Sequence, residues 1–285
     1  MKIGMSERMF DKGTIEESIK SAARIGYDGI ELRPLPNHLP ADTSPTRLNE
    51  IKAMVRDNGL EVPCIACMPK SYLDKSDAEC EALIDEMKVF IGFAQVLECK
   101  VLRHWIGAKP SRKATEGDWE TATTWMRKCA EAAAGEGITL ALELHHGTLI
   151  DTVDSSVAFL KRVAKDNVTI IHDAANLYQD NVEYGRAAIE KLKDNLQEIH
   201  AKDIVEVVDE CNPRAGGSYR GRRFVDRMID QGGVDQYSIF TGLKNIDFDG
   251  YAVVESGLVG DLDSYAVADG CYRAIRQIMK ALDME

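Results

Sequence analysis

Long hydrophobic runs are absent from this 285-residue chain: none approaches the ~20 apolar residues that a membrane-spanning helix needs. The first residues, MKIGMSERMF, also lack the apolar core of a signal peptide. Positive charge is scarce, since 35 Lys and Arg stand against 47 Asp and Glu, a formal net charge of −12. Nucleic-acid binding normally requires clustered basic residues that displace counterions. We therefore expect a cytoplasmic protein that binds neither membranes nor nucleic acid.

A second cysteine pair at zinc-finger spacing is missing too. The seven cysteines are an odd number and scattered, which suits reduced thiols in a large intracellular enzyme. Cys64 and Cys67 form a C-x-x-C, but they lie inside the apolar run VPCIACM without a second pair, so we interpret them as buried structural residues. The three tryptophans, Trp105, Trp119 and Trp125, are interpreted as core residues.

The chain does contain a regular alternation of short apolar runs and amphipathic segments of helical period. Eight such units can be drawn, and no Pro- or Ser-rich linker divides them. The pattern predicts one α/β domain over residues 1–285, a (β/α)₈ TIM barrel, whose typical length is roughly 250 residues. The predicted strands are 2–5, 29–32, 62–67, 101–105, 138–143, 168–173, 198–201 and 251–255. The predicted helices lie near 14–25, 45–58, 77–97, 117–135, 154–165, 183–194, 234–244 and 263–282.

Four potential metal ligands end consecutive apolar runs in the C-terminal half. Glu143, Asp173, His200 and Glu255 are the last residues of ITLALE, VTIIHD, LQEIH and YAVVE. In a closed parallel barrel the carboxyl ends of the strands meet at one mouth, so these side chains should converge. Buried carboxylates are rare unless they are paired or bind metal. Three carboxylates and one imidazole suit a single Mn²⁺, Mg²⁺, Co²⁺ or Zn²⁺ ion.

The alternation of side chains along a strand assigns the histidines beside these ligands to the inward or the outward face of the sheet. His145 lies two residues beyond Glu143 and shares its face, so it could act as an acid, a base or a hydrogen-bond donor to substrate. His146 is interpreted as structural. His172 directly precedes Asp173 and should point away from the site, as a core residue or a support for the ligands.

Other polar residues at strand ends could line the mouth and bind substrate. Glu31, Arg33 and His104 occupy such positions on earlier strands, and packing or ion pairing at the rim is their alternative role. Lys202 and Asp203 directly follow His200, so they could orient it or bind a substrate oxygen.

The longest connection at the strand ends runs from His200 to the helix near Val234. It contains NPRAGGSYRGRR, with four arginines in an otherwise acidic protein: Arg214, Arg220, Arg222 and Arg223. Barrel active sites are built from these connections, so one interpretation is a mobile lid or an arm that binds an anionic substituent, with Arg223 as a substrate ligand. The other interpretation is an exposed loop or a subunit contact.

Nearly the whole chain resembles the xylose isomerase-like TIM barrel superfamily, the sugar isomerase and epimerase group. The resemblance rests on GYDGIEL, LRHWIG, ALELHH, IIHDAANLY, EIHAKD, GGVD and FDGYAVVES. It implies that Glu143, Asp173, His200 and Glu255 hold one divalent ion, and that Glu143 and Glu255 form the acid/base pair. The implied function is isomerisation or epimerisation of a sugar or polyol, by proton transfer beside a carbonyl through a metal-stabilised enediolate. A homodimer or homotetramer is also implied.

One departure from the superfamily leaves the reaction open. Many relatives have a histidine three residues after the sixth-strand aspartate, whereas this chain has Asn176 there. The alternatives are a lyase that resembles inosose or dehydroshikimate dehydratases, or the catalytic subunit of C-glycoside deglycosidases, in which the base would be His145. A non-catalytic sugar-binding barrel is the third possibility.

Overall fold

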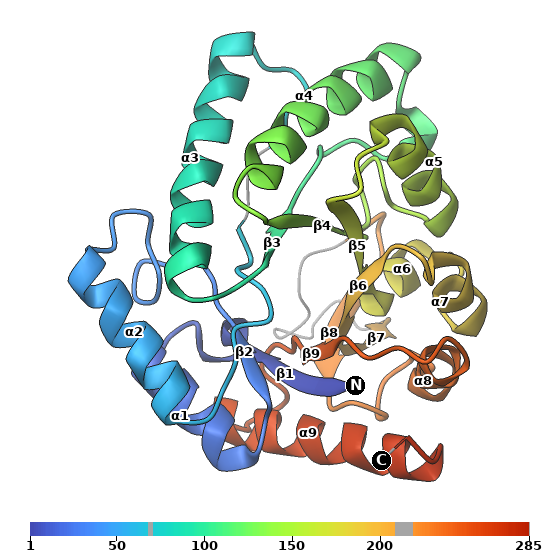
Figure 1. Ribbon diagram of the computed structural model, residues 1–285. Helices are drawn as coiled ribbons and strands as arrows, with labels where there is room; N and C mark the ends of the chain where they lie inside the picture. Colours follow the sequence, from blue (N-terminus) through green and yellow to red (C-terminus); the bar gives the residue numbers. More distant parts are fainter. Residues whose placement is uncertain (68–70, 209–218, 285) are drawn as a thin grey trace.

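Parallel strands form a curled sheet that is enclosed by helices (Figure 1). The structure is a computed structural model that describes residues 1–67, 71–208 and 219–284. Within these residues, seven strands pair in parallel in the order β2-β1-β9-β6-β5-β4-β3. They are β1 (Lys2–Ser6), β2 (Gly29–Glu31), β3 (Val101–His104), β4 (Thr139–Glu143), β5 (Val168–Asp173), β6 (Leu196–Ala201) and β9 (Tyr251–Val254).

The eighth position of the barrel is occupied by residues 61–65, between β2 and β3. This segment makes single parallel bridges from Glu61 to Gly29 and from Ile65 to Leu32 and Leu102, instead of a continuous ladder. Pro63 lies in its middle and has no backbone N–H to donate. The barrel prediction is confirmed, but the predicted strand 62–67 is reduced to isolated bridges.

In the part of the chain that the structure describes, eight helices cover the outside of the sheet at the positions that the sequence predicts. Several begin at a capping box: the side chain of Thr14 accepts a hydrogen bond from the Glu17 amide while Glu17 accepts one from the Thr14 amide, and Ser76 pairs in the same way with Glu79. The helices are α1 (Ile15–Ile25), α2 (Pro45–Asp57), α3 (Asp77–Val96), α4 (Glu116–Ala134), α5 (Val153–Val163), α7 (Arg186–Leu192), α8 (Gln236–Asn245) and α9 (Ser264–Ala281).

Other elements lie at the mouth and were not predicted. Helix α6 (Ala174–Asp180) begins directly after β5, and a 3₁₀ turn, η1 (Glu7–Phe10), follows β1. The long connection after His200 contains an antiparallel hairpin of β7 (Asp203–Val207) and β8 (Arg223–Arg227). Arg214 of the predicted arginine arm lies outside the described residues.

Apolar packing is divided between the two faces of the sheet. Most buried apolar residues pack between the strands and the helices, whereas Cys64, Val101, Ala141 and Ile171 form a separate cluster. Ala141 lies two residues before Glu143, so strand parity places this cluster on the same face of the sheet as the predicted ligands. Cys64 and Cys67 are buried and make no disulfide, as expected. Among the described helices, none is both long and apolar enough to cross a bilayer.

Candidate active site

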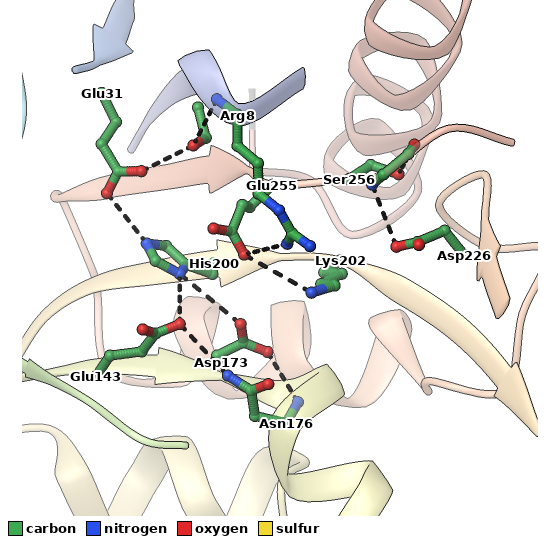
Figure 2. A network of polar contacts seen from close by, with 12 residues as sticks. Arg8, Glu31, Glu143, Asp173, Asn176, His200, Lys202, Asp226, Glu255 and Ser256 are labelled. Carbon is green, nitrogen blue, oxygen red and sulfur yellow. Dashed lines mark hydrogen bonds and ion pairs between the residues drawn. The ribbon is translucent and has the colours of Figure 1, made fainter. Parts of the chain in front are cut away.

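The four predicted ligands converge at the carboxyl ends of their strands. One ligand atom from each of Glu143, Asp173, His200 and Glu255 lies within 4.8 Å of those of the others, and all four residues are buried. The Nδ1 atom of His200 lies 3.3 Å from Oε1 of Glu143 and 3.8 Å from Oδ2 of Asp173. Figure 2 shows these side chains directed toward one another from neighbouring strands.

This cluster fits a divalent cation. The Oδ1 atom of Asp173 accepts the backbone N–H of Asn176 at 2.9 Å, whereas its Oδ2 atom is buried and has no hydrogen-bond partner. A buried carboxylate oxygen without a partner is costly unless a cation stabilises it. Oxygen-rich ligand sets with one imidazole suit Mg²⁺, Mn²⁺, Co²⁺ or Zn²⁺, and the geometry does not choose among these ions.

The opposite edge of His200 faces two further carboxylates. Its Nε2 atom lies 3.3 Å from Glu31 Oε2 and 3.5 Å from Glu198 Oε1, and Ser6 donates a hydrogen bond to the other Glu31 oxygen at 2.9 Å. Glu31 is fully buried behind His200 and does not line the cavity, which corrects its interpretation as a substrate ligand. Glu198 was missed, although it lies two residues before His200 and therefore on the same face. Burial raises the pKa of Glu198 to about 7.

Cations surround both glutamates of the ligand set. Arg103 Nη1 lies 3.2 Å from Glu143 and 3.7 Å from Glu255. Arg8 Nη1 and Lys202 Nζ lie 3.1 and 3.7 Å from the other oxygen of Glu255. Burial alone would raise the pKa of Glu255, but Lys202 and Arg8 outweigh it and lower this pKa to about 2. Arg103 and His200 likewise outweigh the burial of Glu143 and hold its pKa well below the usual range. Both glutamates are therefore carboxylate anions at neutral pH.

Arg103 was missed because sequence reasoning selected its neighbour, His104. Adjacent residues of a strand face opposite sides of the sheet, so only one of the two can point into the barrel. His104 is fully buried outside the cavity lining, and its Nε2 lies 3.0 Å from the hydroxyl of Tyr72. Burial lowers the pKa of His104 to about 3. The interpretation of His104 as a substrate ligand is corrected accordingly.

A cavity of about 450 Å³ opens above the ligand cluster. Glu143 and Glu255 form part of its lining, together with the basic side chains of Arg8, Arg33 and Lys202. Asn176, the departure noted in the sequence, also lines it and donates to Glu143 Oε1 at 3.3 Å. Trp105 was interpreted as a core residue, but it lines the cavity and its Nε1–H donates to Glu143 Oε2 at 3.4 Å.

The histidine pair lies on the wall of this cavity. His145 Nδ1 lies 2.8 Å from the carbonyl oxygen of His146. A carbonyl only accepts, so Nδ1 carries the proton and the neutral ring has its lone pair on Nε2. The ring of His146 packs between His145 and Tyr219, with ring centroids 4.2 and 4.3 Å apart, and burial lowers its pKa to about 4. His172 is buried and absent from the cavity lining, as parity predicts.

The hairpin supplies Ile204, Phe224, Val225 and Asp226 to the wall of the cavity, and two of the arginines beside it are ion-paired. Arg220 pairs with Asp180, and Arg222 pairs with Glu206 at 2.7 Å. Arg223 begins β8, and its role as a substrate ligand stays a prediction.

Asp203, at the start of β7, does not support His200 as proposed from the sequence. Its side chain accepts the backbone N–H groups of Gly232 and Val234, at 2.9 and 3.1 Å. The residue therefore anchors the loop that follows the hairpin. Lys202, its neighbour, does line the cavity as predicted.

Comparison with known proteins agrees with this arrangement. The xylose isomerase-like TIM barrel family matches residues 19–267. The chain belongs to this family. The inosose dehydratase of Glaesserella parasuis is 24% identical to it over 264 residues, which cover 86% of this chain and 83% of that protein. The D-psicose 3-epimerase of Ruminiclostridium cellulolyticum is 24% identical over 253 residues, 83% of this chain and 76% of that protein.

Among solved structures, the IolI protein with a bound zinc atom has the same xylose isomerase-like fold. It superposes with a TM-score of 0.80 over 99% of both chains, at 15% identity. The zinc atom belongs to that structure; in this chain, the cluster of Glu143, Asp173, His200 and Glu255 could hold a metal ion. The two named relatives are a dehydratase and an epimerase, which supports the enzyme prediction without choosing between the two reactions.

Proposed function

We propose that this family member is a divalent-metal-dependent enzyme that eliminates water from a keto polyol of the inosose class. The observation that supports this most directly is the ligand cluster of Glu143, Asp173, His200 and Glu255 at the floor of a polar cavity. A divalent ion held there would polarise a substrate carbonyl as a Lewis acid and so make the adjacent C–H bond acidic.

His145 is the base in this proposal. Its Nδ1 atom donates to the carbonyl oxygen of His146, so the tautomer with this hydrogen bond has its lone pair on Nε2, and the residue lines the cavity. It takes the proton from the carbon beside the carbonyl. The hydroxyl group on the next carbon then leaves with a proton from the Lys202 ammonium group, so the products are water and an unsaturated ketone. His145 then releases its proton to solvent and Lys202 takes up a proton from solvent, which restores both side chains.

Elimination is preferred to epimerisation because of the charge state of the two glutamates. An epimerase that uses Glu143 and Glu255 as its acid/base pair needs one of them to return a proton at the opposite face of the carbon. Cations hold the pKa of Glu143 well below its usual range and lower that of Glu255 to about 2, so both groups are mostly ionised and are weak sources of protons for that step. The match to inosose dehydratase points the same way.

Epimerisation of a ketose is the second candidate. Arg103 lies within 3.7 Å of both Glu143 and Glu255. Its guanidinium group could therefore stabilise the negative charge on either glutamate as a proton moves from one to the other. The match to D-psicose 3-epimerase favours this reaction as well.

The two reactions are separated by their products. The protein is incubated in D₂O with scyllo-inosose or D-psicose, each with Mn²⁺, Mg²⁺, Co²⁺ or Zn²⁺, and products are followed by NMR and mass spectrometry. We expect loss of one water from the inosose. Deuterium incorporation into D-psicose with formation of its 3-epimer would instead establish the second candidate, and no reaction with either substrate would refute both. Asp173→Asn, which lacks one ligand charge, is the negative control.

A further inference from the structure

The wall that the hairpin gives to the cavity is apolar except for one carboxylate. Strands β7 and β8 contribute Ile204, Phe224, Val225 and Asp226 to the lining. The three apolar residues are buried, and Ile204 is paired with Asp226 across the hairpin. On this wall, Asp226 is therefore the lining residue of β7 and β8 whose side chain can form hydrogen bonds with a ligand.

One oxygen of the Asp226 carboxylate is fixed and the other has no partner. Its Oδ1 atom accepts the backbone N–H of Gly257 at 3.2 Å. In the described part of the chain, neither a hydrogen bond nor an ion pair involves Oδ2, because Arg8 and Lys202 pair with Glu255 instead. Figure 2 shows Asp226 set apart from the ligand cluster. A carboxylate oxygen only accepts hydrogen bonds, so the free oxygen suits a ligand that donates one.

Gly257 allows the carboxylate to lie against the loop that follows β9. A Cβ atom at this position would lie 2.5 Å from Oδ2 and 2.9 Å from Cγ of Asp226, so a side chain here would displace the carboxylate. Gly257 follows the ligand Glu255 by two residues, and two residues span at most about 7 Å. A small ligand that reaches the cluster is therefore also within reach of Asp226.

We propose that Asp226 selects the substrate by accepting a hydrogen bond from a hydroxyl group that is remote from the reacting carbonyl. This inference rests on the proposed function for the reacting end of the substrate and adds a second point of recognition. A hydroxyl group donates to a carboxylate, whereas an anionic substituent at the same place would be repelled by it. The wall of β7 and β8 therefore favours a neutral polyol.

NMR titration of the Mg²⁺-loaded protein tests this inference without turnover. The probes are scyllo-inositol and trans-1,2-cyclohexanediol, which both offer two adjacent hydroxyl groups to the ligand cluster. The inositol alone carries hydroxyl groups on its remaining carbons. We expect it to bind at least about tenfold more tightly than the diol, and this ratio to fall about tenfold in Asp226→Ala, the range of a hydrogen bond to a charged group.

Two further variants separate recognition of a hydroxyl from a change of charge. Asp226→Asn keeps an acceptor oxygen and should retain part of the ratio. Gly257→Ala keeps the charge but displaces the carboxylate, so it should lower the ratio as Asp226→Ala does. Asp85→Asn, at a residue whose side chain is 72% exposed on α3, is the matched control and should retain the full ratio.

Three results would overturn the inference. They are an inositol that binds no more tightly than the diol, a ratio that survives in Asp226→Ala, and an equal loss of both ligands in Asp226→Ala. The last result would mean that Asp226 only holds the loop at Gly257 in place. If the ratio changes as expected but no water is eliminated from any keto polyol, the proposed reaction fails and the hydroxyl-binding role of Asp226 stands.

Discussion

The Nε2 atom of His200 lies 3.3 Å from a carboxylate oxygen of Glu31, and both side chains are fully buried (Figure 2). A carboxylate at this edge keeps a proton on Nε2, which leaves Nδ1, the nitrogen that faces Glu143 and Asp173, to bind a cation. Ser6 donates to the other oxygen of Glu31 and fixes its orientation. The proposed metal ligand on β6 is therefore oriented by residues of β1 and β2.

Replacement of Glu31 should weaken metal binding although Glu31 is outside the ligand set. In Glu31→Gln the negative charge behind His200 is lost, so we expect the affinity for Mn²⁺ to fall about 10- to 100-fold, the range typical of such supporting carboxylates. Calorimetric titration with Mn²⁺ measures this effect. Glu190→Gln, on the exposed face of α7, is the matched control and should bind Mn²⁺ with the affinity of the unmodified protein. An unchanged affinity in Glu31→Gln would show that the orientation of His200 is set elsewhere.

Asp173 has two functions that two substitutions can separate. Its Oδ1 atom caps α6 through the backbone N–H of Asn176, and its Oδ2 atom belongs to the ligand cluster. Asp173→Asn keeps a capping oxygen and removes the charge, so metal binding should be lost while stability without metal is retained. Asp173→Ala should lose the cap as well, at a cost of about 1 kcal/mol. Metal content and urea unfolding in the presence of a chelator measure both effects; equal stability of Asn and Ala variants would argue against the capping role.

His145 should matter to turnover more than to metal binding. As the proposed base it takes a proton from substrate, so His145→Gln should lower kcat by about 10²- to 10⁴-fold with its metal content unchanged. His146→Gln is the comparison, because His146 packs between His145 and Tyr219 and should act mainly on KM. Steady-state kinetics with the best substrate from the D₂O screen measure the two constants. A His145→Gln variant with nearly full kcat would move the role of base to another residue.

The convergence of the four candidate ligands could be predicted because its signal is local. Each of Glu143, Asp173 and His200 ends or nearly ends a strand whose apolar pattern is plain in the sequence, and parallel strands bring such ends together. The helix positions were accurate for a similar reason, since capping residues such as Thr14 and Ser76 mark where helices begin. No knowledge of distant contacts was required for either conclusion.

The residues around the ligands depend on contacts that a single sequence does not display. Glu31 was expected at the mouth, but β2 is short and places it behind His200. Arg8 was not considered, because nothing in the sequence indicates that a 3₁₀ turn after β1 brings it 3.1 Å from Glu255. The choice of His104 over Arg103 was avoidable. Adjacent residues of a strand face opposite sides of the sheet, as was argued for His172 and Asp173. The same argument places Arg103 in the barrel once the inward face of β3 is known.

The buried state of His104 predicts a specific dependence of stability on pH. Its pKa is about 3 in the folded protein and 6.5 in its ordinary state, so below pH 6.5 the unfolded chain binds a proton that the folded protein does not. The contribution of neutral His104 is fully present above pH 6.5 and is lost progressively as the pH falls toward 3. Each such histidine lowers the free energy of unfolding by up to about 1.4 kcal/mol for each unit by which the pH falls in this range.

His104→Gln should therefore reduce the pH dependence of stability by about one proton between pH 6 and 4. Urea unfolding at several pH values, in the presence of a chelator, measures that slope independently of any constant loss of stability from the substitution. Tyr72→Phe removes the hydroxyl that contacts His104 at 3.0 Å but leaves the buried imidazole, so it should retain the original slope. If His104→Gln keeps the full slope, the acid sensitivity arises from other groups, such as His172, whose pKa burial lowers to about 4.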